Sequence, residues 1–345
     1  MGVSAPPRPR SVPPARPTSA RLRALGEWLA DQGEQVDGAI RVSSIPGGDT
    51  NQSWLVADRA DRRWVLRERR AGDDRPFHRE AAVLVSLAGL GVPVPGLVGH
   101  GRRRGGFFMV TRFVSGAVLD SEHTASRVPA EHRQAVGISA IDTLCDLHSI
   151  DPSAVGMPDF AVGHLDRQLA VLSDLWTRTG SGGIYDSSWR AVRTRLLARR
   201  PAWEGPVQLV HGDFRLPNLV VQKGSTAAIL DWERCTSGNA MSDLAWLLNS
   251  WRHADEPAGR LGSPTRIGGF CSRDELAQRY AARRALNPDH LSFYRAFAHW
   301  TAATLLQASE TRRRTIQDSS GHDNVLDEIQ FSLLEASTLL RRPVC

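Results

Sequence analysis

A polar, turn-prone run, His-Gly-Asp-Phe-Arg-Leu-Pro-Asn at residues 211–218, constrains the fold of this chain more than any other feature. A largely apolar stretch before it predicts a buried strand, and a hairpin with a Lys-Gly-Ser turn is predicted after it. The strands predicted in this way are residues 207–210, 219–222 and 227–230. Asp231 follows the last strand, so the hairpin brings the carboxylates of Asp213 and Asp231 and the carboxamide of Asn218 to one place.

These three side chains suit metal-assisted phosphoryl transfer. In that reaction a carboxylate accepts or orients the proton of the attacking hydroxyl, while oxygen ligands hold Mg²⁺ on the nucleotide phosphates. Asp213 and Asn218 are five residues apart, which is the spacing in the catalytic loop of protein kinases. A single aspartate after a strand more often forms a turn or caps a helix. The hypothesis therefore depends on the three residues together.

Three motifs, in this order, resemble those of the aminoglycoside-phosphotransferase-like, choline-kinase-related family of small-molecule kinases. They are His-Gly-Asp-Phe-Arg-x-x-Asn, Leu-Asp-Trp-Glu and Asp-Leu-Ala-Trp-Leu, at residues 211–218, 230–233 and 243–247. The likeness runs over residues 40–248 and is nearest to the subgroup found fused to acyl-CoA dehydrogenases. It implies an α+β, bilobal, protein-kinase-like fold. An N-terminal antiparallel sheet with a helix is expected to precede a mostly helical C-terminal lobe.

The resemblance also assigns roles to residues of the central run. It implies that Asp213 is the catalytic base and that Asn218 and Asp231 are the metal ligands. Arg215 takes the place where many kinases have a cation near the γ-phosphate.

Two further residues are expected to support this loop rather than to react. Asp243 is expected to hold the loop from a neighbouring helix. His211 is expected to brace the loop through hydrogen bonds.

The expected division of the chain is a disordered tail followed by two lobes. Residues 1–19 are rich in Pro, Ala, Ser and Arg and contain too little apolar surface to bury a core. Residues 20–114 are the expected nucleotide-binding lobe. Residues 115–345 are the expected helical lobe, which carries the catalytic hairpin and the acceptor site.

A glycine-containing turn between two predicted strands, residues 46–51, is the expected cover of the nucleotide. Glycines in such a turn let backbone amides approach phosphates, although any hairpin turn looks similar. The residues expected to contact the nucleotide there are Gly47, Gly48, Thr50 and Asn51. Farther along, Thr111 and Phe113 lie in the expected link between the lobes, whose backbone is expected to hydrogen-bond an adenine.

The residue that grips the phosphates in most kinases is a lysine, and this chain departs from that pattern. Lys223, in the hairpin turn, is its single lysine. Arg67 on a predicted strand is the candidate replacement, because arginine binds phosphate bidentately and stays charged. Glu80 on the following predicted helix is expected to orient Arg67. Arg69 is the rival of Arg67, and solvated surface positions are the alternative for both arginines and for Glu80.

The composition removes several other classes of protein. The residue directly before Lys223 is Gln222, so the Gly-Lys pair of a Walker-type P-loop is absent and such a loop is excluded. The four cysteines lack paired or metal-ligand spacing and no apolar run reaches membrane length, so we expect a cytoplasmic protein without a membrane partner. The net charge of +6 comes from scattered arginines that acids nearly match, which disfavours nucleic acid as a partner. The oligomeric state stays open.

The sequence thus predicts a kinase that uses ATP, with GTP not excluded, and Mg²⁺ to phosphorylate a hydroxyl of a small molecule. Arginines slightly outnumber acids in residues 252–345, which disfavours a polycationic aminoglycoside as the acceptor. An antibiotic, another secondary metabolite and a hydroxyacyl compound all stay open. The alternative is a catalytically impaired kinase fold that binds a nucleotide or a partner. The missing lysine favours this alternative, whereas the three intact oxygen-bearing residues argue against it.

Overall fold

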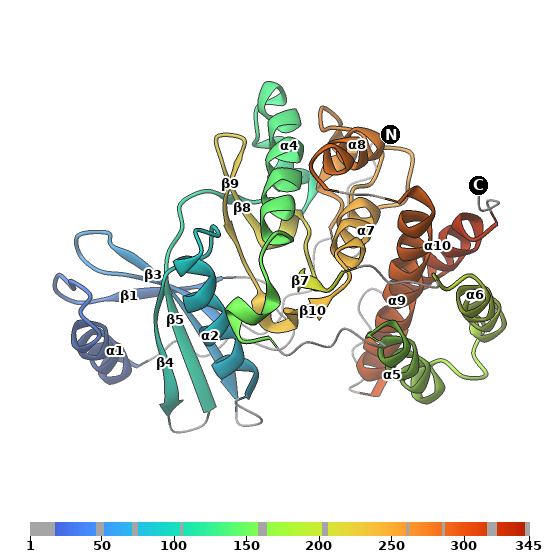
Figure 1. The fold of residues 1–345 in the computed structure, drawn as a ribbon. Coiled ribbons are helices and arrows are strands. Elements are labelled where there is room, and N and C mark those ends of the chain that lie inside the picture. The colour runs from blue at the N-terminus through green and yellow to red at the C-terminus, as the bar shows by residue number, and fades with distance from the viewer. Residues whose placement is uncertain are drawn as a thin grey trace, which may run out of the picture. The chain divides into compact units, whose positions relative to one another are not determined.

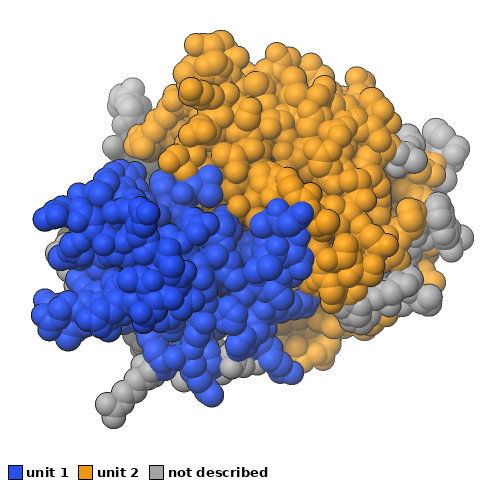
Figure 2. Space-filling view, turned by 60° about the vertical axis from the view of Figure 1, so that its left-hand side comes forward, with its two compact units in different colours: residues 1–89, 95–114 blue, residues 90–94, 115–345 orange. Residues whose placement is uncertain are grey.

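The computed structural model describes residues 18–45, 52–70, 75–103, 106–157, 164–201, 206–259, 262–284, 287–315 and 323–341. The chain divides into two compact units, which Figure 2 shows in different colours. Unit 1 comprises Met1–Gly89 and Pro95–Val114, and unit 2 comprises Leu90–Val94 and Ser115–Cys345. Residues 1–17 of the expected tail lie outside the described residues.

Unit 1 is built on a five-stranded antiparallel sheet with the strand order β1-β2-β3-β5-β4 (Figure 1). The strands are β1 Arg41–Ile45, β2 Gln52–Ala57, β3 Arg63–Arg70, β4 Leu97–Arg103 and β5 Gly106–Arg112. The described helices of this unit are α1 Ser19–Asp31 and α2 Arg75–Gly89. The predicted antiparallel sheet with a helix is therefore confirmed.

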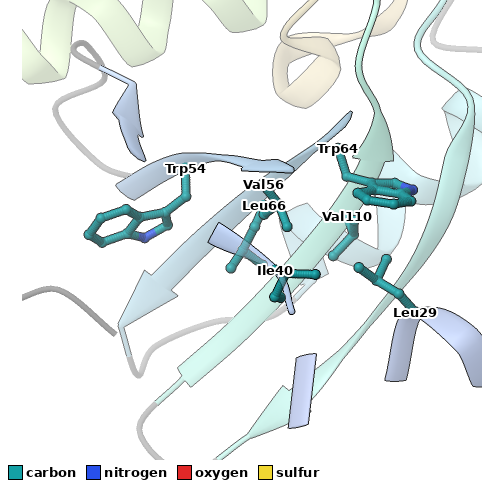
Figure 3. Packing of buried hydrophobic residues seen from close by; sticks show 7 residues of the cluster. All are labelled: Leu29, Ile40, Trp54, Val56, Trp64, Leu66 and Val110. Atoms are coloured by element: carbon teal, nitrogen blue, oxygen red, sulfur yellow. The ribbon is translucent and has the colours of Figure 1, made fainter. Parts of the chain in front are cut away.

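The two-residue period of β3 separates the two faces of this sheet. Trp64 and Leu66 are buried in an apolar cluster on the face that packs against α1, as Figure 3 shows. Arg67 lies on the opposite face and pairs with Glu80 of α2. The cluster drawn in Figure 3 is Leu29, Ile40, Trp54, Val56, Trp64, Leu66 and Val110. One strand thus contributes both to the core of unit 1 and to a candidate phosphate-binding face.

Unit 2 is mostly helical, as predicted for the C-terminal lobe. Its α-helices are α3 Glu122–Ser126, α4 Ala130–Leu147, α5 His164–Thr179, α6 Asp186–Ala198, α7 Met241–Ser250, α8 Arg273–Arg283, α9 Pro288–Thr315 and α10 Asp323–Leu339. Helix α9 packs against α5, α6, α7 and α10. Trp189 stacks on Trp176 and on Trp300, with ring centroids 4.9 and 4.7 Å apart, which fixes α5, α6 and α9 together.

Short strands of unit 2 carry the central polar run. They are β6 Ala117–Val118, β7 Gln208–Val210, β8 Leu219–Gln222, β9 Ser225–Ile229 and β10 Thr236–Gly238. Strands β6, β8 and β9 form one antiparallel sheet, and β7 pairs with β10. The predicted hairpin is present as β8 and β9, and the α+β fold class is confirmed. Within the described part of the chain, every helix is too short or too polar to span a bilayer.

Candidate functional site

The loop after β7 depends on a glycine for its path. Gly212 has φ +83°, and a Cβ at this position would lie 2.7 Å from the carbonyl oxygen of Arg234. A positive φ and a backbone neighbour at that distance both exclude a larger residue without rearrangement. The next residue, Asp213, is thereby placed directly after a tight bend.

Three donors hold the carboxylate of Asp213. Oδ1 accepts a hydrogen bond from Nε1 of Trp246 at 2.6 Å and one from Nε of Arg215 at 2.9 Å. Oδ2 accepts one from Nδ2 of Asn218 at 2.8 Å. Hydrogen bonds to a charged carboxylate are stronger than neutral ones, so this side chain has a well-defined orientation. Its side chain is 13% exposed, so it is largely but not completely buried.

Asn218 is oriented by the same contacts. Its Nδ2 donates to the backbone oxygen of Asp213 and to Oδ2 of Asp213, both at 2.8 Å. Because both partners are acceptors, the amide nitrogen must point toward them. Oδ1 of Asn218 accepts no hydrogen bond from the described residues, and this oxygen is the kind of ligand that Mg²⁺ prefers.

The β8–β9 hairpin returns the chain to this loop. Lys223 and Gly224 form its turn with φ +51° and +81°, as two-residue hairpins of this type require. At the end of the hairpin the N–H of Leu230 donates to the carbonyl oxygen of Asn218 at 2.8 Å. Nε2 of His211 lies 2.9 Å from the carbonyl oxygen of Leu230. Two backbone contacts of Leu230 therefore hold the end of the hairpin against the loop, directly before the next residue.

That residue, Asp231, has a left-handed backbone conformation with φ 64° and ψ 66°. Such a conformation costs a non-glycine residue about 1–2 kcal/mol, and strain of this kind gathers at functional sites. Oδ1 of Asp231 is buried. The structure thus brings Asp213, Asn218 and Asp231 to one loop and one hairpin end, as the sequence predicts, while their chemical roles stay predictions.

Asp243, in the first turn of α7, holds the backbone of the loop. Its Oδ2 accepts from the N–H of His211 at 2.6 Å, and its Oδ1 accepts from the N–H of Gly212 at 2.8 Å. The predicted bracing role of Asp243 is therefore confirmed. His211 braces the loop as well, because the N–H of Asp213 donates to its Nδ1 at 3.2 Å while its Nε2 faces the carbonyl of Leu230.

A buried chain of hydrogen bonds lies behind Asp243. Nε2 of His148 is 3.4 Å from Oδ2 of Asp243, and Nδ1 of His148 is 2.8 Å from the hydroxyl of Tyr280. Burial lowers the pKa of His148, so its ring is neutral at pH 7 and has one donor and one acceptor nitrogen. A carboxylate only accepts, so Nε2 donates to Asp243 and Nδ1 accepts from Tyr280. Burial also raises the pKa of Tyr280, which keeps its donor proton.

In unit 1, the predicted pair between Arg67 and Glu80 is present. The side chain of Glu80 is 3% exposed and that of Arg67 is 18% exposed. The guanidinium carbons of Arg67 and Arg69 lie 6.0 and 5.9 Å from the ring centroid of Phe77. The geometry favours Arg67 over Arg69, because a buried carboxylate fixes its guanidinium.

The other expected nucleotide contacts are placed only in part. Gly47, Gly48, Thr50 and Asn51 lie outside the described residues. Thr111 is paired within β5, opposite Val65 of β3 and Leu97 of β4. The N–H of Phe113 donates to the carbonyl oxygen of Arg63 at 3.1 Å, so this donor is already used.

A pocket of unit 2 begins beside Asp213, in the lobe expected to carry the acceptor site, although its lining residues were not predicted. Two of its lining residues, Arg215 and Trp246, are the donors to Oδ1 of Asp213. The remaining lining residues are Asn249, Ser250, Arg252, Gly259, Gly262, Ala298, His299, Ala302, Glu328 and Ser332. They come from α7, α9, α10 and the segment after α7. Trp246 lies in the Asp-Leu-Ala-Trp-Leu motif, but its position within an apolar helix reads as core.

The donor set fits a nucleotide-bound Mg²⁺ better than a protein-caged metal. Among the described residues, no group of three or more His, Cys, Asp or Glu side chains could hold a metal ion. Mg²⁺ commonly takes one or two protein oxygens and completes its shell with phosphates and water. The oxygens of Asn218 and Asp231 match that requirement.

Comparisons with known proteins agree with this geometry. A model of the phosphotransferase enzyme family matches residues 41–286. The chain is 27% identical over 366 residues to acyl-CoA dehydrogenase family member 10 of Mus musculus, a match that covers 94% of this chain and 32% of that protein. The chain thus spans about a third of the length of this relative. The expected likeness to acyl-CoA-dehydrogenase-associated proteins is confirmed.

Two solved structures show the same fold. One is a protein from Ralstonia eutropha JMP134 that is assigned as an aminoglycoside phosphotransferase, with 23% identity, a TM-score of 0.73 and coverage of 92% of this chain and 96% of that chain. The other is a thermostable mutant of the aminoglycoside phosphotransferase APH(4)-Ia in complex with ADP and hygromycin B. It has 13% identity, a TM-score of 0.66 and coverage of 92% and 98%. The predicted protein-kinase-like fold is therefore confirmed.

Proposed function

The chain belongs to the phosphotransferase enzyme family, and on that basis we propose that it transfers the γ-phosphate of ATP to a hydroxyl of a small molecule with the help of Mg²⁺. The observation that carries the proposal is the Asp213 carboxylate, which three donors orient beside the carboxamide of Asn218. Positioning of this kind supplies most of the catalysis in phosphoryl transfer, because the protein does little covalent work.

Each residue of the loop has one task in this proposal. Asp213 accepts the proton of the acceptor hydroxyl through Oδ2, since Oδ1 already accepts two hydrogen bonds. Asn218 and Asp231 hold Mg²⁺, which neutralises charge on the phosphates when it is bound. Arg215 stabilises the negative charge of the transferred group, while its Nε keeps Asp213 in place.

Unit 1 provides the nucleotide-binding lobe in this proposal. Arg67 binds the phosphates in place of the usual lysine, and the buried carboxylate of Glu80 orients it. The glycine-containing turn at residues 46–51 covers the phosphates. A backbone carbonyl at residues 111–113 accepts from the base, since the N–H groups of Arg112 and Phe113 are already engaged. ADP in the APH(4)-Ia complex supports an adenine nucleotide, with GTP still open.

The pocket beside Asp213 is the proposed acceptor site. Ligand sites hold a small molecule with a few placed polar groups, and this pocket combines Trp246 and two alanines with polar side chains from α7, α9 and α10. Hygromycin B in the APH(4)-Ia complex supports a small-molecule acceptor. An antibiotic, another secondary metabolite and a hydroxyacyl compound are the candidate acceptors.

One alternative has a specific feature in its favour. The absence of a lysine at the phosphate-binding position suits a fold that binds a nucleotide or a partner without turnover. Binding of ATP that requires Mg²⁺, without any transfer to water or an acceptor, would favour this alternative.

A phosphate-transfer screen tests the proposal. Purified protein is incubated with γ-labelled ATP, Mg²⁺ and panels of aminoglycoside, macrolide, choline-like and hydroxyacyl acceptors. We expect Mg²⁺-dependent labelling of at least one hydroxyl compound, which Asp231→Ala abolishes. Failure to bind ATP with or without Mg²⁺, together with no labelled product, would contradict the proposal.

A further inference from the structure

The pocket beside Asp213 contains two buried polar side chains with no assigned role. His299 of α9 is 4% exposed and Ser332 of α10 is 1% exposed, and both line the pocket. Neither side chain has a hydrogen-bond partner among the residues that the structure describes. Neither side chain contributes an atom to the fully buried polar atoms that lack a partner, so their polar atoms keep some accessible surface where they line the pocket. A ligand in the pocket would satisfy both groups.

The other polar side chains of the pocket are held by their neighbours. Asn249 donates through Nδ2 to the carbonyl oxygen of Arg295 at 2.8 Å and accepts at Oδ1 from Nε of Arg295 at 3.0 Å. Arg252 donates to the carbonyl oxygen of Pro257 at 2.9 Å and to Oε1 of Glu328 at 3.3 Å. These side chains form fixed walls, whereas His299 and Ser332 keep their hydrogen-bonding capacity for a ligand.

The charge around His299 is unfavourable for a cation. Burial first, and then the guanidinium groups of Arg295, Arg252 and Arg273, lower the pKa of His299 well below its ordinary value. The carboxylates of Glu328 and Glu256 are already engaged. Glu328 accepts from Arg252, and Glu256 accepts from Arg273 at 2.7 and 2.6 Å.

A neutral imidazole offers one donor and one acceptor nitrogen, which suits hydroxyl groups. Beside His299 an ammonium group would meet three guanidinium charges, and Glu328, which lines the pocket, is already paired with Arg252. Burying a charge without a partner is costly, so the surroundings select against such a ligand.

We propose that His299 and Ser332 bind the phosphoryl acceptor, and that this part of the site selects uncharged or anionic hydroxyl compounds over compounds that carry ammonium groups. The inference rests on the proposed phosphotransferase function. It deepens that function because it separates this chain from enzymes whose acceptors are polycationic aminoglycosides. Trp246 connects the two ends of the site, since it lines the pocket and donates to Asp213.

A series of three sugars with one carbon frame tests the selectivity. D-glucose is neutral, D-glucosamine carries an ammonium group and D-glucuronate carries a carboxylate. Each is titrated into ¹⁵N-histidine-labelled protein while the ring resonances of His299, assigned with His299→Gln, are followed by NMR. We expect the Kd values from these shifts to be at least about tenfold lower for glucose and glucuronate than for glucosamine. Equal or tighter binding of glucosamine, or no shift by any of the three, would overturn the proposal.

Substitutions on α10 give a second test that leaves His299 intact. Ser332→Ala should weaken glucose binding by about tenfold, the loss expected for one hydrogen bond. Ser332→Asp should reverse the preference, because the new carboxylate can pair with the ammonium group of glucosamine. An unchanged ratio of glucosamine to glucose binding in Ser332→Asp would contradict the proposal. His132→Gln, on the exposed face of α4, is the matched control for His299→Gln and should bind all three sugars as the wild type does.

The two proposals fail separately in this design. Mg²⁺-dependent ATP binding is measured on the same preparations, and its absence contradicts the phosphotransferase function. The sugar titrations report on the pocket itself, whether or not ATP binds.

Discussion

Nε1 of Trp246 donates a hydrogen bond to Oδ1 of Asp213 across 2.6 Å. Asp243 lies three residues earlier on the same helix, α7, and accepts hydrogen bonds from the backbone N–H groups of His211 and Gly212. One helix therefore positions both the main chain of the loop and the side chain of its proposed base. This arrangement supplies the preorganisation that phosphoryl transfer requires.

Removal of the indole donor should slow the chemical step more than it weakens nucleotide binding. Trp246→Phe keeps an aromatic ring but removes the hydrogen bond to Asp213, so the carboxylate can rotate away from its working orientation. We expect kcat to fall by about tenfold and the KM for ATP to change by less than about twofold. Steady-state kinetics with the acceptor found by the screen measures both values. Trp28→Phe in α1 is a matched control. An equal fall in kcat for this control would contradict a specific role of Trp246.

The arginine that binds the phosphates should be identifiable from nucleotide KM values. Arg67→Ala should raise the KM for ATP by about tenfold or more, because a charged hydrogen bond to phosphate is lost. Arg69→Ala should have a smaller effect, since the pairing with buried Glu80 fixes Arg67. The double variant Arg67→Ala/Glu80→Gln avoids leaving a buried carboxylate beside the deletion. A large effect of Arg69→Ala without one of Arg67→Ala would transfer the role to Arg69.

Two substitutions at Asp231, which has a left-handed backbone, should separate the effect of this residue on stability from its effect on metal binding. Asp231→Gly should be more stable than Asp231→Ala by about 0.5–1 kcal/mol, because glycine adopts a positive φ without strain but loses more entropy on folding. Both variants should lose Mg²⁺-dependent ATP binding by more than about tenfold. Denaturant unfolding and ATP titration with and without Mg²⁺ measure the two effects. Retention of Mg²⁺-dependent binding in either variant would show that Asp231 is not a metal ligand.

Acid should destabilise the protein through His299. Its pKa is lowered in the folded protein from the ordinary value of 6.5, chiefly by burial, so the unfolded chain binds a proton that the folded chain excludes. The stability contributed by the neutral ring is therefore fully present above pH 6.5 and is lost as the pH falls below it, by at most about 1.4 kcal/mol per pH unit. Urea unfolding at pH 7.5, 6.5 and 5.5 should show a weaker pH dependence for His299→Gln than for wild type. An unchanged slope in His299→Gln, equal to that of the His132→Gln control, would contradict this account.

The parts of the fold that follow from local sequence rules could be predicted. The strand Leu219–Gln222 begins and ends as predicted, because a turn follows it in which Gly224 adopts a positive φ without strain. Alternation along β3 places Arg67 away from the core, where the predicted pair with Glu80 forms. The bracing roles of Asp243 and His211 were implied by the resemblance to the kinase family, and the observed hydrogen bonds confirm them.

The rest depends on contacts between distant parts of the chain. Strand β10, Thr236–Gly238, is polar and three residues long, so only its pairing with β7 makes it a strand. The pocket gathers side chains from α7, α9 and α10, and no local period indicates which of them face it. The sequence does not indicate that His299 and Ser332 line a pocket, because their burial depends on how distant helices pack together.

The central claim is that Asp213 is the base of a phosphoryl transfer, and Asp213→Asn tests it most directly. The substitution preserves the shape of the side chain but removes its ability to accept the hydroxyl proton. Transfer of labelled γ-phosphate from ATP is measured with the acceptor found by the screen, and with water alone. We predict that turnover falls by about 10²- to 10⁴-fold while the affinity for Mg²⁺-ATP stays within about threefold of wild type. Turnover close to that of the wild type would contradict the account.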